Sequence, residues 1–150
     1  MGVTRLVLDG LGFPESTRWR DGRVWLCNWG AGEVLAVSTD GEREVMARLA
    51  PQTLPFSIDW LPDGRLLVID GPQRLLLRQG PGGALDAIAD LTGFGSAPFN
   101  ELVVDAAGNS YVNGDREASC ASGRTAACAR SLTSCGGPTA WRWSTAAARW

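Results

Sequence analysis

A hairpin motif occurs three times along the chain at a nearly constant interval. In each copy a strand-forming run leads into a turn that ends in glycine, and a second such run follows; the glycines are Gly22, Gly64 and Gly108. Their separations are 42 and 44 residues. A repeat of about 40 to 45 residues with four short strands is the period of a propeller blade, whereas a β-sandwich requires no fixed interval. We therefore predict an all-β fold, a partial β-propeller.

The repeat covers only part of a ring. A propeller has four blades or more, so the smallest needs about 168 residues at this period, and the chain has 150. We assign residues 1–114 to about two and a half blades. Residues 115–150 contain no Val, Ile, Phe, Tyr or Met, and Leu132 is their only large aliphatic side chain. Because such a stretch buries too little to form alternating strands, we expect an irregular, low-complexity tail of Ala, Arg, Ser and Cys, either disordered or translated out of frame.

The inventory of charged residues and cysteines excludes several classes of function. The chain has no His and no Lys, which excludes a Ser-His-Asp triad and an imidazole metal site. A formal net charge of −2 leaves no basic excess for nucleic acid or an anionic membrane. No apolar run is long enough for a membrane helix and no signal-peptide core is recognisable, which predicts a cytoplasmic protein. The spacing of the four Cys residues matches no zinc motif, so free thiols are expected.

Each copy of the motif has an oxygen-bearing side chain seven residues before its glycine. These residues are Glu15, Ser57 and Glu101, and Asn100 is one step from the last of them. The innermost strands of a propeller begin around one central channel, so equivalent positions converge there. Carboxylate and amide oxygens suit a hard cation such as Ca²⁺ or Mg²⁺. The alternative is that Glu15 is a solvated loop acid, since polar residues often begin strands.

Other polar and aromatic residues have simpler structural interpretations. Asp59, Asp63 and Asp105 resemble strand-end and turn acids, and Cys27 is most simply a small buried hydrophobe. Asn113 is a marginal candidate for the channel. Four Trp residues are expected to pack between blades rather than to stack on a sugar. They are Trp19, Trp25, Trp29 and Trp60.

Three groups of residues resemble one known family. They are LGFPE at residues 11–15 with Trp19, LPFSIDWLPDGRLLV at residues 54–68, and FNELVVD at residues 99–105 with GNSYVN at residues 108–113. About residues 10–113 are similar to the N-terminal half of the SMP-30/gluconolactonase/LRE-like family. The resemblance implies a six-bladed propeller that holds a divalent cation, usually calcium, and hydrolyses sugar lactones or related esters. It also implies that Glu15 is a metal ligand and that Asn100 lines the metal and substrate pocket.

The chain also departs from the family's pattern. Ser16 and Thr17 follow Glu15 where many members have Gly-Pro. The family's remaining metal ligands, an Asn and an Asp, and its proposed general base lie in later blades, so no catalytic residue is assigned. We expect a truncated hydrolase that is inactive by itself, with Ca²⁺ as its cation and Mg²⁺, Mn²⁺ or Zn²⁺ as alternatives. Ser57 and Glu101 are weaker candidates to line the channel.

Two other interpretations stay open at this point. One is a non-catalytic β-repeat module that associates with itself or with a partner through open blade edges, because unpaired strand edges invite further pairing. The other is a pseudogene product without function. For the hydrolase, the expected partner is a small lactone or ester, with no nucleic acid and no membrane.

Overall fold

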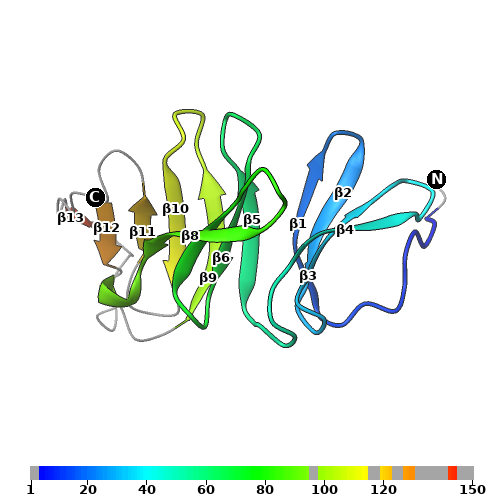
Figure 1. Cartoon of the computed structure of the whole chain (residues 1–150), viewed down its shortest axis with the longest axis horizontal. Helices are drawn as coiled ribbons and strands as arrows, with labels where there is room; N and C mark the ends of the chain where they lie inside the picture. Colours follow the sequence, from blue (N-terminus) through cyan, green and yellow to red (C-terminus); the bar gives the residue numbers. More distant parts are fainter. Residues whose placement is uncertain (1–3, 95–97, 115–118, 123–126, 131–141, 145–150) are drawn as a thin grey trace.

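The structure of the chain is a computed structural model that describes residues 4–94, 98–114, 119–122, 127–130 and 142–144. Apart from one short 3₁₀ turn, η1 (Thr92–Phe94), the regular structure of these residues consists of strands. They form three antiparallel sheets that follow one another along the molecule, as successive propeller blades do (Figure 1). This arrangement confirms the all-β prediction. The part described contains no helix of the length and apolarity needed to cross a bilayer.

Each sheet is a meander in which strands consecutive in sequence are hydrogen-bonded neighbours. The first sheet contains β1 (Pro14–Arg20), β2 (Arg23–Asn28), β3 (Glu33–Val37) and β4 (Arg43–Arg48). The second contains β5 (Phe56–Trp60), β6 (Leu66–Asp70), β7 (Leu75–Gln79) and β8 (Leu85–Asp90). The third contains β9 (Phe99–Val104), β10 (Ser110–Gly114), β11 (Ser119–Ser122), β12 (Ala127–Arg130) and β13 (Arg142–Ser144).

The third sheet continues into the stretch for which the sequence predicts no strands. Strands β11, β12 and β13 extend it beyond β10, with pairings such as Val112 with Cys120. These three short strands are regular structure within the stretch that the sequence assigns to an irregular tail. Backbone hydrogen bonds to an existing strand edge need no large apolar side chain, which is why composition missed them. The rest of the tail from 115 to 150 lies outside the described residues.

The hairpin turns explain the glycine of each motif. Between β1 and β2 the turn consists of Asp21 and Gly22, both with positive φ (51° and 74°). The other two hairpins turn through three residues that end in Gly64 (φ 88°) and Gly108 (φ 84°). Glycine adopts this left-handed conformation without steric cost. The first turn is therefore one residue shorter than the other two.

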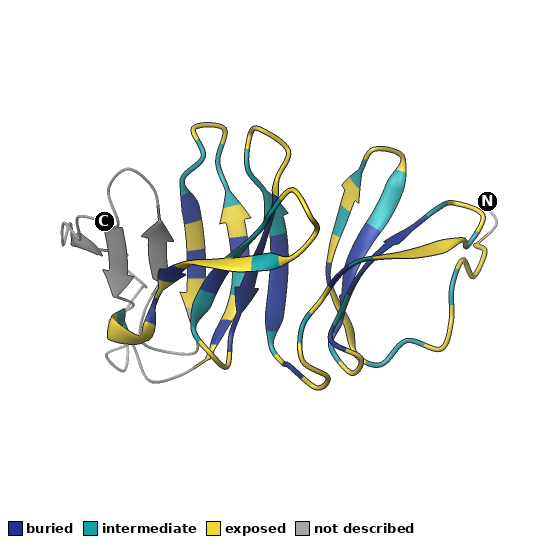
Figure 2. Ribbon diagram, viewed as in Figure 1, coloured by how far each residue is buried: buried dark blue, intermediate teal, exposed yellow. Residues whose placement is uncertain are grey.

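Two apolar interfaces join the sheets, and Figure 2 shows buried strands on both sides of each. The first interface, between the first and second sheets, contains Trp25, Cys27, Val34, Ala36, Ala47, Phe56, Ile58, Leu66 and Val68. The second interface, between the second and third sheets, contains Leu67, Ile69, Leu76, Ala89, Leu91, Phe99, Leu102 and Val112. Because side chains alternate along a strand, β6 contributes to both interfaces and is buried throughout.

The other face of the first sheet is covered by the segment that precedes β1. Leu8 and Leu11 of this segment pack against a buried cluster of Leu26, Leu35 and Val37. The first sheet is thus shielded on both faces, although the chain places a second sheet on only one of them.

Strands β1, β5 and β9 are the first strand, and an edge, of their respective sheets. They are the inner strands of the blades, and β5 contacts both β1 and β9. Side chains of each sheet form hydrogen bonds with the backbone edge of the inner strand in the sheet that follows it. The Trp29 indole donates to the Phe56 carbonyl at 2.7 Å, and Asp59 accepts the Val104 N–H at 2.6 Å. These bonds satisfy backbone groups that edge strands otherwise leave unpaired.

Candidate functional site

The sheet registers align the three residues that the hairpin spacing singles out. Glu15 pairs with Cys27, Ser57 with Ile69 and Glu101 with Asn113, and each partner stands five residues after the hairpin glycine of its sheet. In the first sheet one additional residue in β1 offsets the shorter turn. Glu15, Ser57 and Glu101 therefore occupy equivalent positions in their blades.

Both predicted ligands lie at irregularities of the inner strands. The β1–β2 register shifts between Glu15 and Arg18, where Ser16 has a φ of 50°. In the β9–β10 ladder the partners change from Glu101 to Phe99, which leaves Asn100 unpaired between them. The β5–β6 ladder shows no such shift. β-Bulges are frequent next to active sites because they redirect a side chain.

Glu15 and Asn100 are exposed, and their side chains form no hydrogen bond or ion pair with the part of the chain that the structure describes. The residues that follow them in sequence, Ser16 and Glu101, are in contact, with the Ser16 hydroxyl donating to the Glu101 carboxylate at 3.5 Å. The beginnings of β1 and β9 are therefore neighbours. A carboxylate and an amide, neither with a partner among the described residues, thus lie at one end of the inner strands on segments that a side-chain contact connects.

A polar cluster lies beside these two residues. The Glu101 carboxylate accepts hydrogen bonds from the buried Ser57 hydroxyl and from the Arg18 guanidinium, the latter at 2.6 Å. Arg18 also donates to the Leu102 carbonyl at 3.2 Å. Ser57 and Glu101, predicted as weaker channel-lining candidates, are thus bonded to each other. Sequence reasoning missed the contributions of Arg18 and Ser16, for which only their proximity to Glu15 gave a signal.

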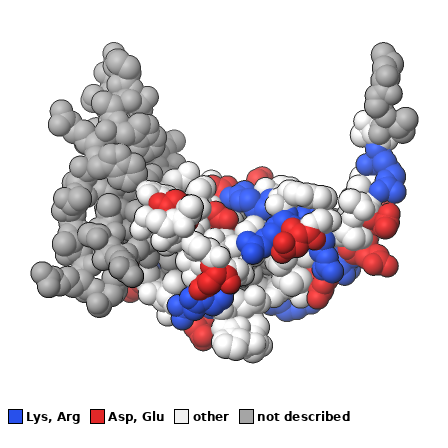
Figure 3. Space-filling model, turned by 90° about the horizontal axis from the view of Figure 1, so that it is seen from above, with Lys and Arg blue, Asp and Glu red and all other residues white. Residues whose placement is uncertain are grey.

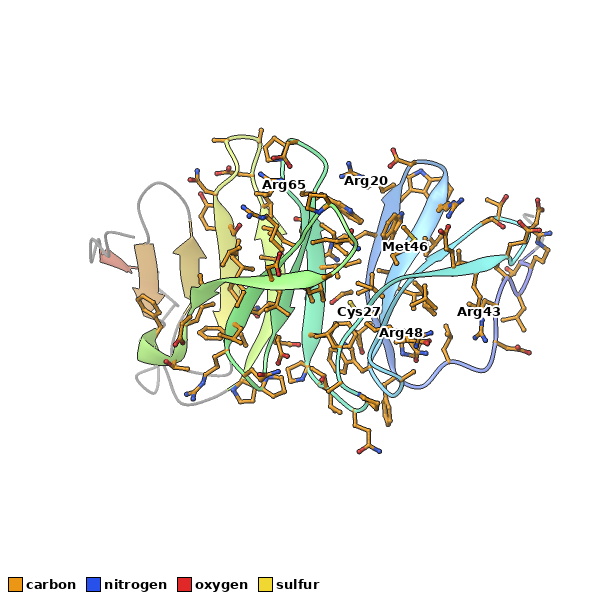
Figure 4. The ribbon with its side chains drawn as sticks, in the orientation of Figure 1. Arg20, Cys27, Arg43, Met46, Arg48 and Arg65 are labelled. Atoms are coloured by element: carbon orange, nitrogen blue, oxygen red, sulfur yellow. The ribbon has the colours of Figure 1, made fainter. Side chains whose placement is uncertain are left out.

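Cys27 lies near enough to Glu101 and Arg18 to feel their charges. It is fully buried at the first interface, where Figure 4 labels its side chain. Burial raises the pKa of its thiol, and the nearby Glu101 carboxylate adds to the increase, while Arg18 and a hydrogen bond with Ser16 oppose it. A thiol in this state is a poor nucleophile. Its interpretation as a small buried hydrophobe is consistent with this environment.

The remaining acids have structural partners. Asp63 binds the backbone N–H and guanidinium of Arg65, and these hydrogen bonds lower its pKa. Asp105 accepts from Asn109 across its turn, which likewise lowers the pKa of Asp105. Asp59 ties β5 to β9, as described above. All three have the structural roles that the sequence predicts.

Of the four Trp residues expected between blades, Trp19 is an exception. Trp25 and Trp60 pack edge to face at 5.0 Å, and Trp29 packs against the first interface. Trp19 is 65% exposed, because it lies near the end of β1 on the face turned away from the second sheet. Asn113 accepts the Glu101 N–H at 2.9 Å, so that it supports the irregularity at Asn100.

The donor set fits a hard cation in kind but is incomplete in number. Glu15 and Asn100 supply two oxygen donors, whereas Ca²⁺ takes six to eight. The described residues contain no group of three or more His, Cys, Asp or Glu side chains suited to a metal. On the face shown in Figure 3, acidic and basic side chains are interspersed rather than gathered into one patch.

Comparison with solved structures supports the fold. A gluconolactonase of Xanthomonas campestris, described as important in glucose secondary metabolic pathways, superposes with a TM-score of 0.57 at 15% identity, over 86% of this chain and 46% of that one. Virginiamycin B lyase from Staphylococcus aureus superposes with a TM-score of 0.55 at 12% identity, over 91% and 42%. The chain thus spans less than half the length of either. No family model and no curated protein matches the sequence. At these identities the likeness concerns the fold alone, and it confirms the partial propeller.

Proposed function

We propose that this chain forms the first blades of a hydrolase of sugar lactones or related esters that depends on a divalent cation. Glu15 and Asn100 would hold the cation, with Ca²⁺ as the expected ion and Mg²⁺, Mn²⁺ or Zn²⁺ as alternatives. When bound, such a cation acts as a Lewis acid on a carbonyl oxygen. Asn100 would also contact the substrate.

The observation that carries this proposal is the pair of bulges on β1 and β9. They expose a carboxylate and an amide that have no partner among the described residues, on segments joined by the Ser16–Glu101 contact. A solvated loop acid would require neither a second bulge nor a neighbouring oxygen donor. The resemblance in sequence supports this substrate class, and the propeller fold shared with a gluconolactonase is compatible with it.

The proposal has two parts that can be tested separately. Isothermal titration of the full chain with Ca²⁺ is expected to give saturable binding that is lost in Glu15→Gln. Glu42→Gln is the matched control, because Glu42 is an exposed acid on the β3–β4 turn, away from the inner strands. Absence of binding, or equal loss in both variants, would contradict the cation site.

Hydrolysis is tested with gluconolactone as the probe, followed by acid release. Two oxygen ligands from the described residues leave the cation site short of donors, so we expect cation binding without turnover by the chain alone. Turnover in the presence of Ca²⁺ that is lost in Asn100→Ala would show that the chain needs no further blade. Turnover that Glu15→Gln leaves unchanged would refute the assigned ligands.

Two observations count against the alternative of a binding module that pairs through strand edges. The backbone groups on the inner edges of β5 and β9 already form hydrogen bonds with side chains of the preceding sheet, those of Trp29, Ser57 and Asp59. The outer strand β4 has exposed charged side chains at Arg43 and Glu44, which disfavour strand addition. If the chain dimerises without binding a cation, this alternative gains support over the hydrolase.

A further inference from the structure

We infer that Glu101 is a positioning residue that sets the geometry of Glu15 and Asn100 without touching the cation or the substrate itself. This inference rests on the proposed function. Its basis is that one carboxylate contacts all three inner strands. Glu101 on β9 accepts hydrogen bonds from Ser16 and Arg18 on β1 and from Ser57 on β5.

Hydrogen bonds of Glu101 and Leu102 restrain the backbone on the C-terminal side of the irregular position Asn100. The Glu101 N–H donates to Asn113 at 2.9 Å, so the residue next to the unpaired Asn100 is fixed to β10. The Leu102 N–H donates to Ser57 at 3.2 Å and to the Glu101 carboxylate at 3.3 Å. A bulge leaves one residue outside the ladder, and these bonds replace the ladder there.

The same carboxylate holds the bulge of β1. Ser16 lies within the register shift that follows Glu15, Arg18 resumes the ladder at its end, and both donate to Glu101. The backbone of Glu15 is therefore restrained through its neighbours rather than through its own side chain.

The negative charge of Glu101 is already paired with the positive charge of Arg18. This distinguishes the role of Glu101 from that of Glu15. Arg18 pairs with Glu101 at 2.6 Å, and the two side chains are 26% and 39% exposed. Glu15 has no ion pair among the described residues. A cation at the site would therefore find Glu15 available and Glu101 occupied by the guanidinium.

Hydrogen–deuterium exchange of the full chain tests this inference without any cation. Glu101→Gln is expected to reduce protection over residues 14–18 and 99–102 and to leave β6 unchanged. Glu33→Gln is the matched control, since it breaks a Glu–Arg pair of similar length, 2.5 Å to Arg48, within one sheet. Unchanged protection in both segments of Glu101→Gln, or an equal loss in the control, would overturn the inference.

A second pair of variants covers the case in which Glu101→Gln does not fold. Arg18→Met removes the guanidinium but keeps an apolar stem, and it is expected to loosen the same two segments. Arg18→Lys retains the charge and should restore part of the protection. Equal protection in the Met and Lys variants would show that the ion pair does not position the segments.

Titration with Ca²⁺ then links the inference to the site. Loss of a supporting residue around a metal commonly weakens binding by about 10- to 100-fold, and we expect at least about tenfold weaker Ca²⁺ binding in Glu101→Gln with no change in Glu33→Gln. Wild-type affinity in Glu101→Gln would overturn the inference. If the wild-type chain binds no Ca²⁺, the proposed function fails, and the exchange experiment still decides whether Glu101 positions the two segments.

Discussion

The two interfaces between the sheets are built from different chemistry. At the first interface Trp25 and Trp60 meet edge to face at 5.0 Å, within a cluster that also contains the fully buried Phe56. The second interface is mainly aliphatic, and across it Ser57 and Asp59 accept hydrogen bonds from the Leu102 and Val104 N–H groups of β9.

Polar bonds to the backbone cross both interfaces, since Trp29 and Gln79 donate to the Phe56 and Met46 carbonyls at the first. What differs is the apolar packing, aromatic at one interface and mainly aliphatic at the other, and the nearness of the second interface's polar bonds to Asn100.

The difference between the interfaces lies in the kind of apolar packing and in the place of the directional contacts. Packing of apolar groups is not directional and tolerates small shifts, whereas a hydrogen bond fixes two groups within a narrow distance and angle. The polar bonds of the second interface lie beside the bulge at Asn100. We therefore expect changes at the first interface to lower overall stability, and changes at the second to act mainly on the geometry near the candidate site.

The largest effect should come from removing an aromatic side chain at the first interface. Phe56→Ala is expected to lower the free energy of unfolding by about 3–5 kcal/mol, because it leaves a cavity in the core. Urea unfolding followed by Trp fluorescence measures this loss. The control is Phe13→Ala, the same change at a side chain that is 74% exposed. If the two variants lose equal stability, the first interface is not the stabilising contact.

A smaller, local effect is expected at the second interface. Asp59→Ala leaves the N–H groups of Trp60 and Val104 without their acceptor, which costs about 1–3 kcal/mol. Asp59→Asn keeps one acceptor oxygen and should lose less. Amide exchange at Val104 reports the change directly. Equal destabilisation by Ala and Asn would mean that the hydrogen bonds do not account for the loss.

Raising the pH should weaken the first interface through Cys27. Burial raises the pKa of its thiol above the ordinary value of 9.0, so the folded state resists ionisation. This contribution to stability is complete below pH 9 and falls as the pH rises further, at about 1.4 kcal/mol per pH unit. Unfolding free energies at two alkaline pH values, compared between wild type and Cys27→Ala, isolate it. A slope that the substitution leaves unchanged would contradict the burial of this thiol.

The smallest effect concerns the rim of the first interface. The Arg20 guanidinium lies 4.7 Å from the centre of the Trp60 ring, and Arg20→Met should cost about 0.5–1 kcal/mol through loss of this cation–π contact. Asp21→Asn, which removes only the exposed ion pair of Arg20, should change stability little. Thermal unfolding of the two variants compares them. A larger loss in Asp21→Asn would assign the contribution to the ion pair.

The fold could be predicted because its signal is local. Each hairpin glycine must adopt positive φ, and such a requirement leaves its mark at one position per blade, as at Gly22 and Gly64. The strands of the third sheet beyond β10 left no such mark. They form through backbone pairing to a neighbouring edge, which nearly any side chain permits.

The candidate site could be predicted only in outline. Glu15 and Asn100 follow from the repeat and from family resemblance, and their role as ligands stays a prediction. The bulges could not be foreseen, because a register shift depends on the pairing of two strands and not on one residue. The same holds for Arg18, whose bond to Glu101 joins strands 83 positions apart in sequence.

The extra residue in β1 and the shorter turn that follows it cancel each other in the sequence. The extra residue offsets the shorter turn at Gly22, so that Glu15 keeps the seven-residue distance from the hairpin glycine that its counterparts in the other blades have. Deleting a single residue from the bulge would give a regular ladder with Glu15 still opposite Cys27, but it would shorten the distance to Gly22 by one residue. Equivalent positions of such blades are therefore better matched by the pairing partner than by the distance from the turn, and a search that assumes constant spacing would miss a blade with only one of the two irregularities.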